Sequence, residues 1–284
     1  MRHIDLAIAA GAFLLLGAGA ASAQDWSGPY IGLSVGGAMT DDDANERTVF
    51  DTNLDGGFND TVRRSDGQDA FAATAATPGG FCGGKARADN LPTGCIDDDE
   101  VRTDFAARAG WDFQSGRMVY GVMVEAASVD VEDFATAFST TPAAYQFNRD
   151  LDDVMYAARL RLGYTVGSRS LAYVTGGAAM AKVTDTYFTT NTANSFAPLT
   201  SEDDATGYQI GGGFETRMGE RITVGLEYLY TDLDAGDGLT VRVGPGAAPL
   251  TNPFRIVNPN GTDQRRESDN IAFHALRLTI AARF

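Results

Sequence analysis

The residues most able to bind a ligand lie in an acidic segment, residues 41–100, which holds 14 acidic and five basic side chains. Within it, Asp51, Asn53 and Asp55 supply oxygen atoms at every second position just before a glycine. That spacing is typical of the first half of a calcium-binding loop. The twelfth position, where such loops carry glutamate, is Val62. The segment therefore leaves two alternatives open, a calcium site and a solvated acidic loop.

The same segment contains both cysteines of the chain, Cys82 and Cys95, in a stretch rich in glycine. In an oxidising compartment we expect them to form a disulfide that closes a short loop. Such a bond stabilises a folded segment by roughly 3 kcal/mol when it is unstrained. The spacing is not the CxxC of a redox pair, although two free thiols remain an alternative.

Histidine chemistry has little support in this chain, which contains only His3 and His274. A Ser–His pair needs a serine close to the histidine, and none lies two or four positions after His274. We therefore expect no catalytic site, no enzymatic activity and no cofactor apart from the possible calcium ion. The net charge of −16 also argues against nucleic acid as a partner, because its phosphates would be repelled.

The first residues predict export. A short basic start is followed by an apolar stretch and by Ala21-Ser22-Ala23, which fits a signal-peptide cleavage site. We expect residues 1–23 to be a signal peptide and residues 24–284 to form the mature protein. The residue after the predicted cleavage point is Gln24 rather than cysteine, so a lipid anchor is not expected.

Two-residue alternation of apolar side chains is the dominant pattern after residue 23, and it predicts β-strands. It is clean in six segments, which cover about residues 104–113, 120–126, 158–164, 208–215, 223–230 and 276–284. Two further segments, near residues 30–39 and 171–182, are less clean because they are rich in glycine and alanine. The pattern therefore predicts an all-β fold with eight antiparallel strands.

The connections between these strands alternate between short polar turns and long acidic segments, of which loop 1 (about residues 41–100) is the longest. Short turns on one side and long loops on the other are typical of a transmembrane β-barrel, with the turns in the periplasm and the loops outside. A soluble β-sandwich would also alternate, but it does not explain this regular change in loop length. We therefore predict one eight-stranded outer-membrane barrel.

Charged residues lie on the opposite face of the strands from the apolar residues. In a narrow barrel they would pair with one another inside the lumen, because a charge that faces lipid costs a few kcal/mol. The predicted lumen network consists of Arg108, Glu125, Arg159, Arg161, Glu215, Glu227 and Arg277. Aromatic residues near the turns predict an interfacial girdle that contains Trp26, Tyr30, Phe113, Tyr120, Tyr164, Tyr173, Phe214 and Phe284.

The segment from Trp26 to Leu33, with the sequence WSGPYIGL, resembles the opening strand of small α-proteobacterial outer-membrane barrels of the porin family. These are grouped with the opacity proteins and the transmembrane domain of OmpA. The segments YVTGGA at residues 173–178 and EYLYTDL at residues 227–233 are similar to later strands of that family. The resemblance implies the cell outer membrane of a Gram-negative bacterium. It also implies that Phe284 is part of a C-terminal signal read by the barrel-insertion machinery.

The combined predictions describe an outer-membrane protein whose strands anchor it and whose acidic loops meet the outside. We expect a role in envelope integrity and surface interaction, with outer-membrane lipid and lipopolysaccharide as neighbours. The alternative is a narrow porin-like diffusion channel, because eight strands enclose a lumen only about wide enough for side chains. No pattern in the chain specifies an oligomeric state.

Overall fold

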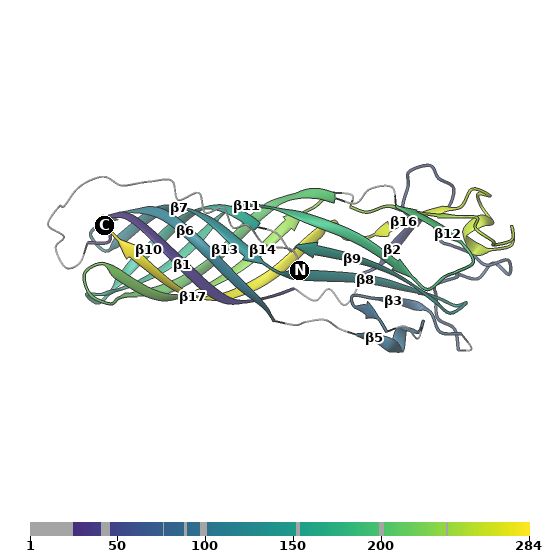
Figure 1. The fold of residues 1–284 in the computed structure, drawn as a ribbon, viewed down its shortest axis with the longest axis horizontal. Coiled ribbons are helices and arrows are strands. Elements are labelled where there is room, and N and C mark those ends of the chain that lie inside the picture. The colour runs from purple at the N-terminus through teal and green to yellow at the C-terminus, as the bar shows by residue number, and fades with distance from the viewer. Residues whose placement is uncertain are drawn as a thin grey trace, which may run out of the picture.

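Eight long antiparallel strands close into a barrel in the computed structural model of this protein, which describes residues 25–40, 46–75, 77–87, 90–96, 101–151, 154–198, 202–236 and 238–284 (Figure 1). The barrel strands are β1 (Gly28–Thr40), β6 (Arg102–Ser115), β7 (Met118–Val129), β10 (Val154–Val166), β11 (Ser170–Thr189), β13 (Glu202–Arg217), β14 (Ile222–Asp234) and β17 (Asn270–Arg283). Each pairs with the next, and β17 pairs with β1 to close the circle. The predicted all-β, eight-stranded barrel is confirmed.

The signal peptide predicted for residues 1–23 lies outside the described residues. In the part of the chain that the structure describes, no helix is both long enough and apolar enough to cross a membrane.

The outer wall of the barrel carries the apolar face of every strand. Leu33, Leu160 and Leu278 are 61%, 68% and 64% exposed, and their chain neighbours point inward. An uninterrupted apolar surface of this extent is unstable in water, and it matches the lipid-facing band of a transmembrane barrel. In the segments where the sequence alternates cleanly, the apolar residues point outward, as the alternation predicted.

At one end of the barrel the strands are joined by three tight turns. Each contains a glycine with a positive φ, which a residue with a Cβ atom rarely adopts. Gly116, Gly167 and Gly219 have φ values of 60°, 64° and 99°. The turns occupy the positions that the sequence predicted.

At the other end, the long connections form ordered β-structure, whereas the sequence predicted loops. Strands β3 (Gly80–Cys82), β8 (Val131–Ser139) and β9 (Ala143–Leu151) continue the barrel sheet beyond β11. A second sheet has the order β12-β15-β16-β2, with β12 (Ser195–Pro198), β15 (Val241–Gly244), β16 (Thr262–Arg266) and β2 (Thr48–Asp51). We call these seven strands, with the last six residues of β11, the extension. Figure 1 shows it continuing the long axis of the barrel.

Aromatic side chains form the core between the two sheets of the extension. The Phe71 ring is 1% exposed and lies 4.7 Å from the Phe50 ring and 5.5 Å from the Tyr145 ring, measured between centroids. Phe254, from the short 3₁₀ helix η2 (Pro253–Arg255), packs 6.0 Å from Phe71. Aromatic contacts of this kind bury large areas, which explains how acidic connections fold into a stable structure.

A buried ion pair lies at the end of the extension that meets the barrel. Arg149 of β9 donates two hydrogen bonds of 2.8 Å to the Asp185 carboxylate of β11, and a third of 2.7 Å to the Asp269 carbonyl. Burial alone would raise the pKa of Asp185, but the hydrogen bonds and charge of Arg149 and the Leu239 amide hold that pKa below its ordinary value. The Asp185 carboxylate is therefore charged at neutral pH.

The predicted disulfide between Cys82 and Cys95 is confirmed. It links β3 to the two-residue strand β5 (Cys95–Ile96), which pairs with β4 (Lys85–Ala86) and follows the 3₁₀ helix η1 (Pro92–Gly94). The bond therefore fastens the end of loop 1 to the sheet that continues the barrel.

Removal of this bond should loosen the extension and leave the barrel intact. In a Cys82→Ser/Cys95→Ser variant we expect the free energy of unfolding of the extension to fall by roughly 3 kcal/mol, because the open loop gains conformational entropy. Limited proteolysis with and without reductant measures this change, and gel mobility of unheated samples reports barrel closure. Equal protease resistance of the variant and the oxidised wild type would contradict the prediction.

Candidate functional site: the barrel lumen

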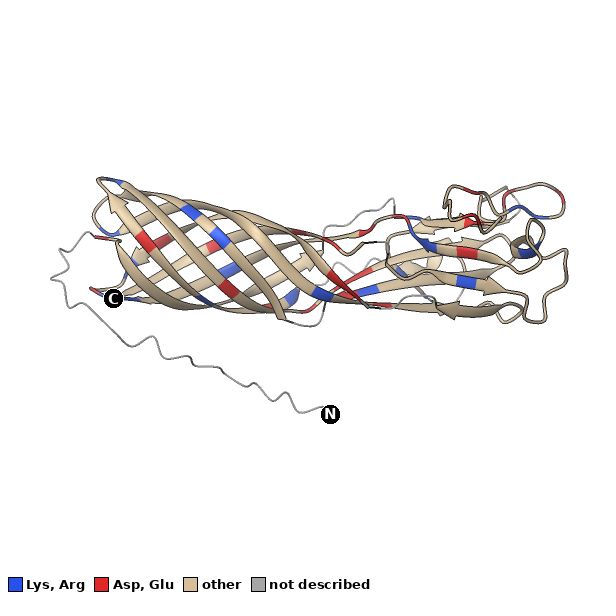
Figure 2. Ribbon diagram, turned by 90° about the horizontal axis from the view of Figure 1, so that it is seen from above, with Lys and Arg blue, Asp and Glu red and all other residues tan. Residues whose placement is uncertain are grey.

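The lumen contains the charged residues that alternation placed there, as bands of basic and acidic positions within the barrel strands (Figure 2). The centre of the larger group is Glu125 on β7. Its carboxylate accepts 2.7 Å and 2.6 Å hydrogen bonds from Arg159 and Arg277. Glu227 on β14 accepts a 3.2 Å hydrogen bond from Arg108, whose guanidinium also lies 3.7 Å from Glu125. These five residues join strands from all sides of the barrel.

A second, smaller group lies nearer the turns. Arg161 lies 2.8 Å from Glu215 and 3.0 Å from Asp112. Arg283 makes a further ion pair with Asp112. All seven members of the predicted network are therefore in the lumen, in two groups.

Two carboxylates of the network were not assigned to it from the sequence. Asp104 accepts a 2.5 Å hydrogen bond from Arg277, and Asp112 binds Arg161. Both lie on the same face of β6 as Arg108, four residues before it and four residues after it. Their position on this face was the signal in the sequence that could have assigned them to the lumen. With them, each lumen arginine has an acidic partner.

Three predicted girdle residues are instead inside the barrel. Trp26, Tyr30 and Tyr173 are 1%, 2% and 5% exposed, so that part of the girdle prediction is wrong. The Arg161 guanidinium lies 4.5 Å from the Tyr173 ring centroid, and the Arg283 guanidinium lies 4.9 Å from that of Tyr30. An aromatic ring attracts a guanidinium over its face, and this cation–π contact favours the inward position.

The remaining predicted girdle residues lie on the outer wall, as expected. These are Phe113, Tyr120, Tyr164, Phe214 and Phe284, all of them exposed.

Trp26 forms a floor at the turn end of the lumen. Its ring lies between two guanidinium groups, 4.9 Å from Arg217 and 5.0 Å from Arg283. Its amide donates a 2.7 Å hydrogen bond to Gln114, and its carbonyl accepts one of 2.5 Å from Arg283. The segment before β1 therefore folds into the mouth of the barrel and fills it.

Above the charged groups, toward the extension, most of the lumen side chains are apolar, and the hydrogen-bonded pair Gln209 and Thr231 lies among them. Leu229, Leu233, Ile271 and Phe273 point inward and are at most 1% exposed. They pack with small side chains from the other strands, among them Ala106, Ala127, Ala157, Ala179 and Ala275. The sequence analysis did not predict this apolar layer. The available signal was that the inward positions of β14 and β17 change from charged residues, Glu227 and Arg277, to large apolar residues toward the extension.

Glycines make room for the large lumen side chains. A Cβ atom at Gly213 would lie 2.5 Å from the Tyr173 hydroxyl, and one at Gly121 would lie 2.0 Å from an Asp112 oxygen. The Tyr173 hydroxyl donates a 2.9 Å hydrogen bond to Glu227. Gly213 therefore leaves space for the inward Tyr173 ring, and Gly121 leaves space for the Asp112 carboxylate.

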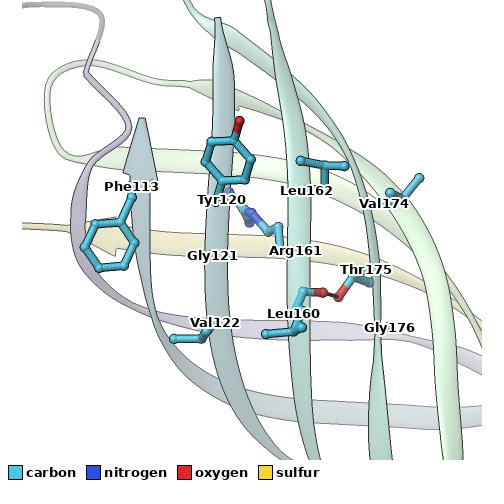
Figure 3. Close-up of a pocket in the computed structure, with 10 residues that line it drawn as sticks. All are labelled: Phe113, Tyr120, Gly121, Val122, Leu160, Arg161, Leu162, Val174, Thr175 and Gly176. Atoms are coloured by element: carbon cyan, nitrogen blue, oxygen red, sulfur yellow. Dashed lines mark hydrogen bonds between the residues drawn. The ribbon is translucent and has the colours of Figure 1, made fainter. Parts of the chain in front are cut away.

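Figure 3 shows a shallow depression on the outside of the wall, between β7, β10 and β11. The exposed side chains around it are apolar and aromatic, including Phe113, Tyr120, Leu160 and Leu162. Arg161 lines it only from behind, since its guanidinium is buried in the lumen. The depression therefore belongs to the apolar outer wall of the barrel.

The three predicted calcium ligands lie together at the end of β2. The Asp51 carboxylate accepts hydrogen bonds from the Leu54, Asp55 and Gly56 amides, and Asn53 accepts one from Asp55. Their oxygens are therefore already bound to backbone amides. Among the described residues, no group of three or more His, Cys, Asp or Glu side chains is arranged to hold a metal ion. Calcium binding by Asp51, Asn53 and Asp55 stays a prediction.

Comparison with known proteins decides the family. Residues 8–284 match the sequence model of the family described as the outer membrane protein beta-barrel domain. The chain belongs to this family. It is a small outer-membrane β-barrel protein of the Gram-negative cell outer membrane, as the resemblance implied.

Individual relatives are distant or match over a short stretch. The chain is similar to the 31 kDa outer-membrane immunogenic proteins of Brucella melitensis and Brucella suis, with 39% identity over 77 residues. This stretch is 26% of the chain and 31% of the length of either relative.

Two solved barrels are also similar. The attachment invasion locus protein Ail of Yersinia pestis is 10% identical with a TM-score of 0.39, and the alignment covers 91% of this chain and 99% of Ail. The outer membrane protease OmpT of Escherichia coli is 10% identical with a TM-score of 0.39, over 93% of this chain and 100% of OmpT.

Removal of one partner from the lumen network should destabilise the barrel strongly, and Glu125 is the test case because two arginines share it. In a Glu125→Gln variant we expect the free energy of unfolding to fall by about 3 kcal/mol, because Arg159 and Arg277 lose their shared charged partner in a buried site. Urea-induced unfolding of the refolded full chain measures the change. Glu220→Gln, which removes an exposed carboxylate from a turn, is the matched control and should change stability little.

A double variant tests the reason for that loss. Glu125→Gln combined with Arg159→Met removes both charges, so its destabilisation should be smaller than the sum of the two single losses. Additive losses would contradict the pairing of these two residues.

Proposed function

We propose that the protein is a non-conducting, non-enzymatic anchor that presents the folded, acidic extension at the cell surface, where it serves envelope integrity and surface interaction. The observation that carries this proposal is the continuous filling of the lumen. From Trp26 through the charged groups to Phe273, side chains occupy the interior and are almost fully buried. The long connections, by contrast, fold into the extension, which provides a surface beyond the barrel that a partner could contact.

The apolar layer argues most strongly against a diffusion channel. An ion that crosses the layer around Leu229 and Phe273 would lose its hydration among mostly apolar side chains. The polar pair at this level, Gln209 and Thr231, is already joined by a 2.8 Å hydrogen bond. Below that layer, Arg159 and Glu125 are already paired with each other. Passage of a solute would require both layers to rearrange.

Two observations support the orientation and the absence of catalysis. Short turns at one end and long connections at the other favour periplasmic turns and an extracellular extension. His274 lies on the outer wall, where its Nδ1 atom is 2.6 Å from the Tyr228 hydroxyl. A Ser–His pair is not supported by the sequence either, because no serine lies two or four positions after His274.

We propose that lipopolysaccharide surrounds the lipid-facing rim of the barrel below the extension. Divalent ions would bridge its anionic groups to the acidic residues of the protein. A calcium site at Asp51, Asn53 and Asp55 would add to the same function by stiffening loop 1.

A planar-bilayer recording tests the non-conducting barrel. We expect the refolded full chain to give no discrete openings at two salt concentrations, because the lumen is filled along its length. Correct folding is checked by the heat-dependent shift in gel mobility. Reproducible openings that change in an Arg159→Gln variant would contradict the proposal and favour the channel.

The surface role is tested by complementation. Cells from which the protein has been deleted should become more sensitive to detergent, and each variant is scored by the resistance that it restores. Wild type and Phe188→Ala should both restore resistance, because Phe188 is 52% exposed. Phe71→Ala removes the centre of the aromatic core, costs about 3–5 kcal/mol within the extension, and should restore resistance poorly. Full restoration by Phe71→Ala, at equal barrel levels, would place the function in the barrel instead.

A further inference from the structure

The three short turns share a feature that the proposed function does not use. In each turn, an arginine follows the glycine with positive φ after zero or one intervening residue. These arginines are Arg117 after Gly116, Arg169 after Gly167, and Arg221 after Gly219. The repeat places one cation at each tight turn of the barrel.

The backbone of each arginine is held in the same way. Its carbonyl accepts a hydrogen bond from the amide at the end of an adjacent strand. The bond from Thr165 to Arg117 is 2.9 Å long, that from Arg217 to Arg169 is 2.9 Å, and that from Arg283 to Arg221 is 2.7 Å. The three arginines therefore occupy equivalent positions on the rim, fixed by the barrel itself.

The side chains of these arginines are exposed and have no acidic partner among the residues described here. Among the described residues, the exposed acidic side chains at this end are Asp25, which accepts a hydrogen bond from the Ser27 amide, and Glu220, whereas Asp112 and Glu215 are buried in the lumen. The other two cations near the floor, Arg217 and Arg283, are buried against Trp26. The exposed charge at the turn end is therefore mainly positive.

The aromatic belt fixes the depth of this ring of charge. The Arg117 guanidinium lies 5.0 Å from the ring centroid of Tyr164, which faces outward. Exposed Phe113, Tyr120 and Phe214 lie on the strands next to the turns. Aromatic belts lie at the level of lipid headgroups, so guanidinium groups just beyond the belt meet the phosphates.

We propose that Arg117, Arg169 and Arg221 form a binding ring for the phosphate groups of anionic phospholipids in the leaflet at the turn end. A guanidinium donates two parallel hydrogen bonds to a phosphate, and its charge attracts an anionic surface. With the turns in the periplasm, this leaflet is the phospholipid leaflet of the outer membrane. The inference needs only the membrane position of the barrel, so it stands or falls separately from the surface role of the extension.

The opposite end of the barrel wall has a different charge. There the outward positions include Asp204, Asp232 and Asp234, with Lys182 as an exposed cation. An anionic lipid that approaches this end without a bridging cation is repelled. The binding of anionic phospholipid should therefore be specific to the turn end.

Native mass spectrometry of the refolded full chain tests the ring. The probes are phosphatidylglycerol and phosphatidylcholine with the same acyl chains, added to the protein in neutral detergent. We expect wild type to retain phosphatidylglycerol in preference to phosphatidylcholine, and this preference should weaken as salt increases. In an R117Q/R169Q/R221Q variant, the preference should fall roughly fivefold for each arginine removed.

The matched control removes three exposed cations elsewhere. An R63Q/R87Q/K182Q variant changes the net charge by the same amount but leaves the turns intact, and it should keep the wild-type preference. If the control loses the preference as much as the turn variant does, general charge explains binding and the ring is wrong.

The wild type alone decides the question if the turn variant does not refold. Equal retention of both lipids by folded wild type would overturn the proposal. It would also be overturned if muropeptides, added in a separate experiment, bound through the same arginines and displaced phosphatidylglycerol, because the partner would then be the cell wall.

Discussion

Closure of eight strands into a narrow barrel places five arginines and five carboxylates in one dry interior, and the structure depends on their mutual pairing. An unpaired charge in that space would cost several kcal/mol, whereas the paired set is close to balanced. The partners come from distant parts of the chain, since Arg277 and Asp104 are 173 residues apart. The network therefore forms only when the barrel closes. It also stabilises one register of the strands, because a shifted register would separate the partners.

The lumen is arranged in layers that perform different tasks. Trp26 and its two arginines close the turn end, the ion pairs link the strands, and the mostly apolar layer around Phe273 separates the ion pairs from the extension. Beyond this layer, in the extension, Arg149 and Asp185 form another buried ion pair between neighbouring strands. Because β9, β8 and β3 continue the barrel sheet, the long connections form one folded extension rather than four independent loops.

The surface charges follow the two ends of the molecule. Acidic residues concentrate in the long connections, while the exposed arginines of the turns lie beside the aromatic belt. The barrel wall between them is apolar. The two ends therefore differ in charge. The turn end attracts anionic lipid, and the opposite end presents acidic side chains to solvent.

Local pattern was enough to predict the strands, the turns, the disulfide and the lumen side of residues such as Glu125, because side-chain direction alternates strictly along a strand. The alternation did not place Tyr30 and Tyr173 correctly, since an aromatic ring suits both lipid and a guanidinium, and only the closed barrel brings Arg161 and Arg283 to them.

The folding of the extension was also decided by tertiary structure. Phe50, Phe71, Tyr145 and Phe254 are widely spaced in polar connections and show no periodicity. They become a core only because the barrel holds the ends of the four connections side by side, which lowers the entropy cost of bringing these rings together.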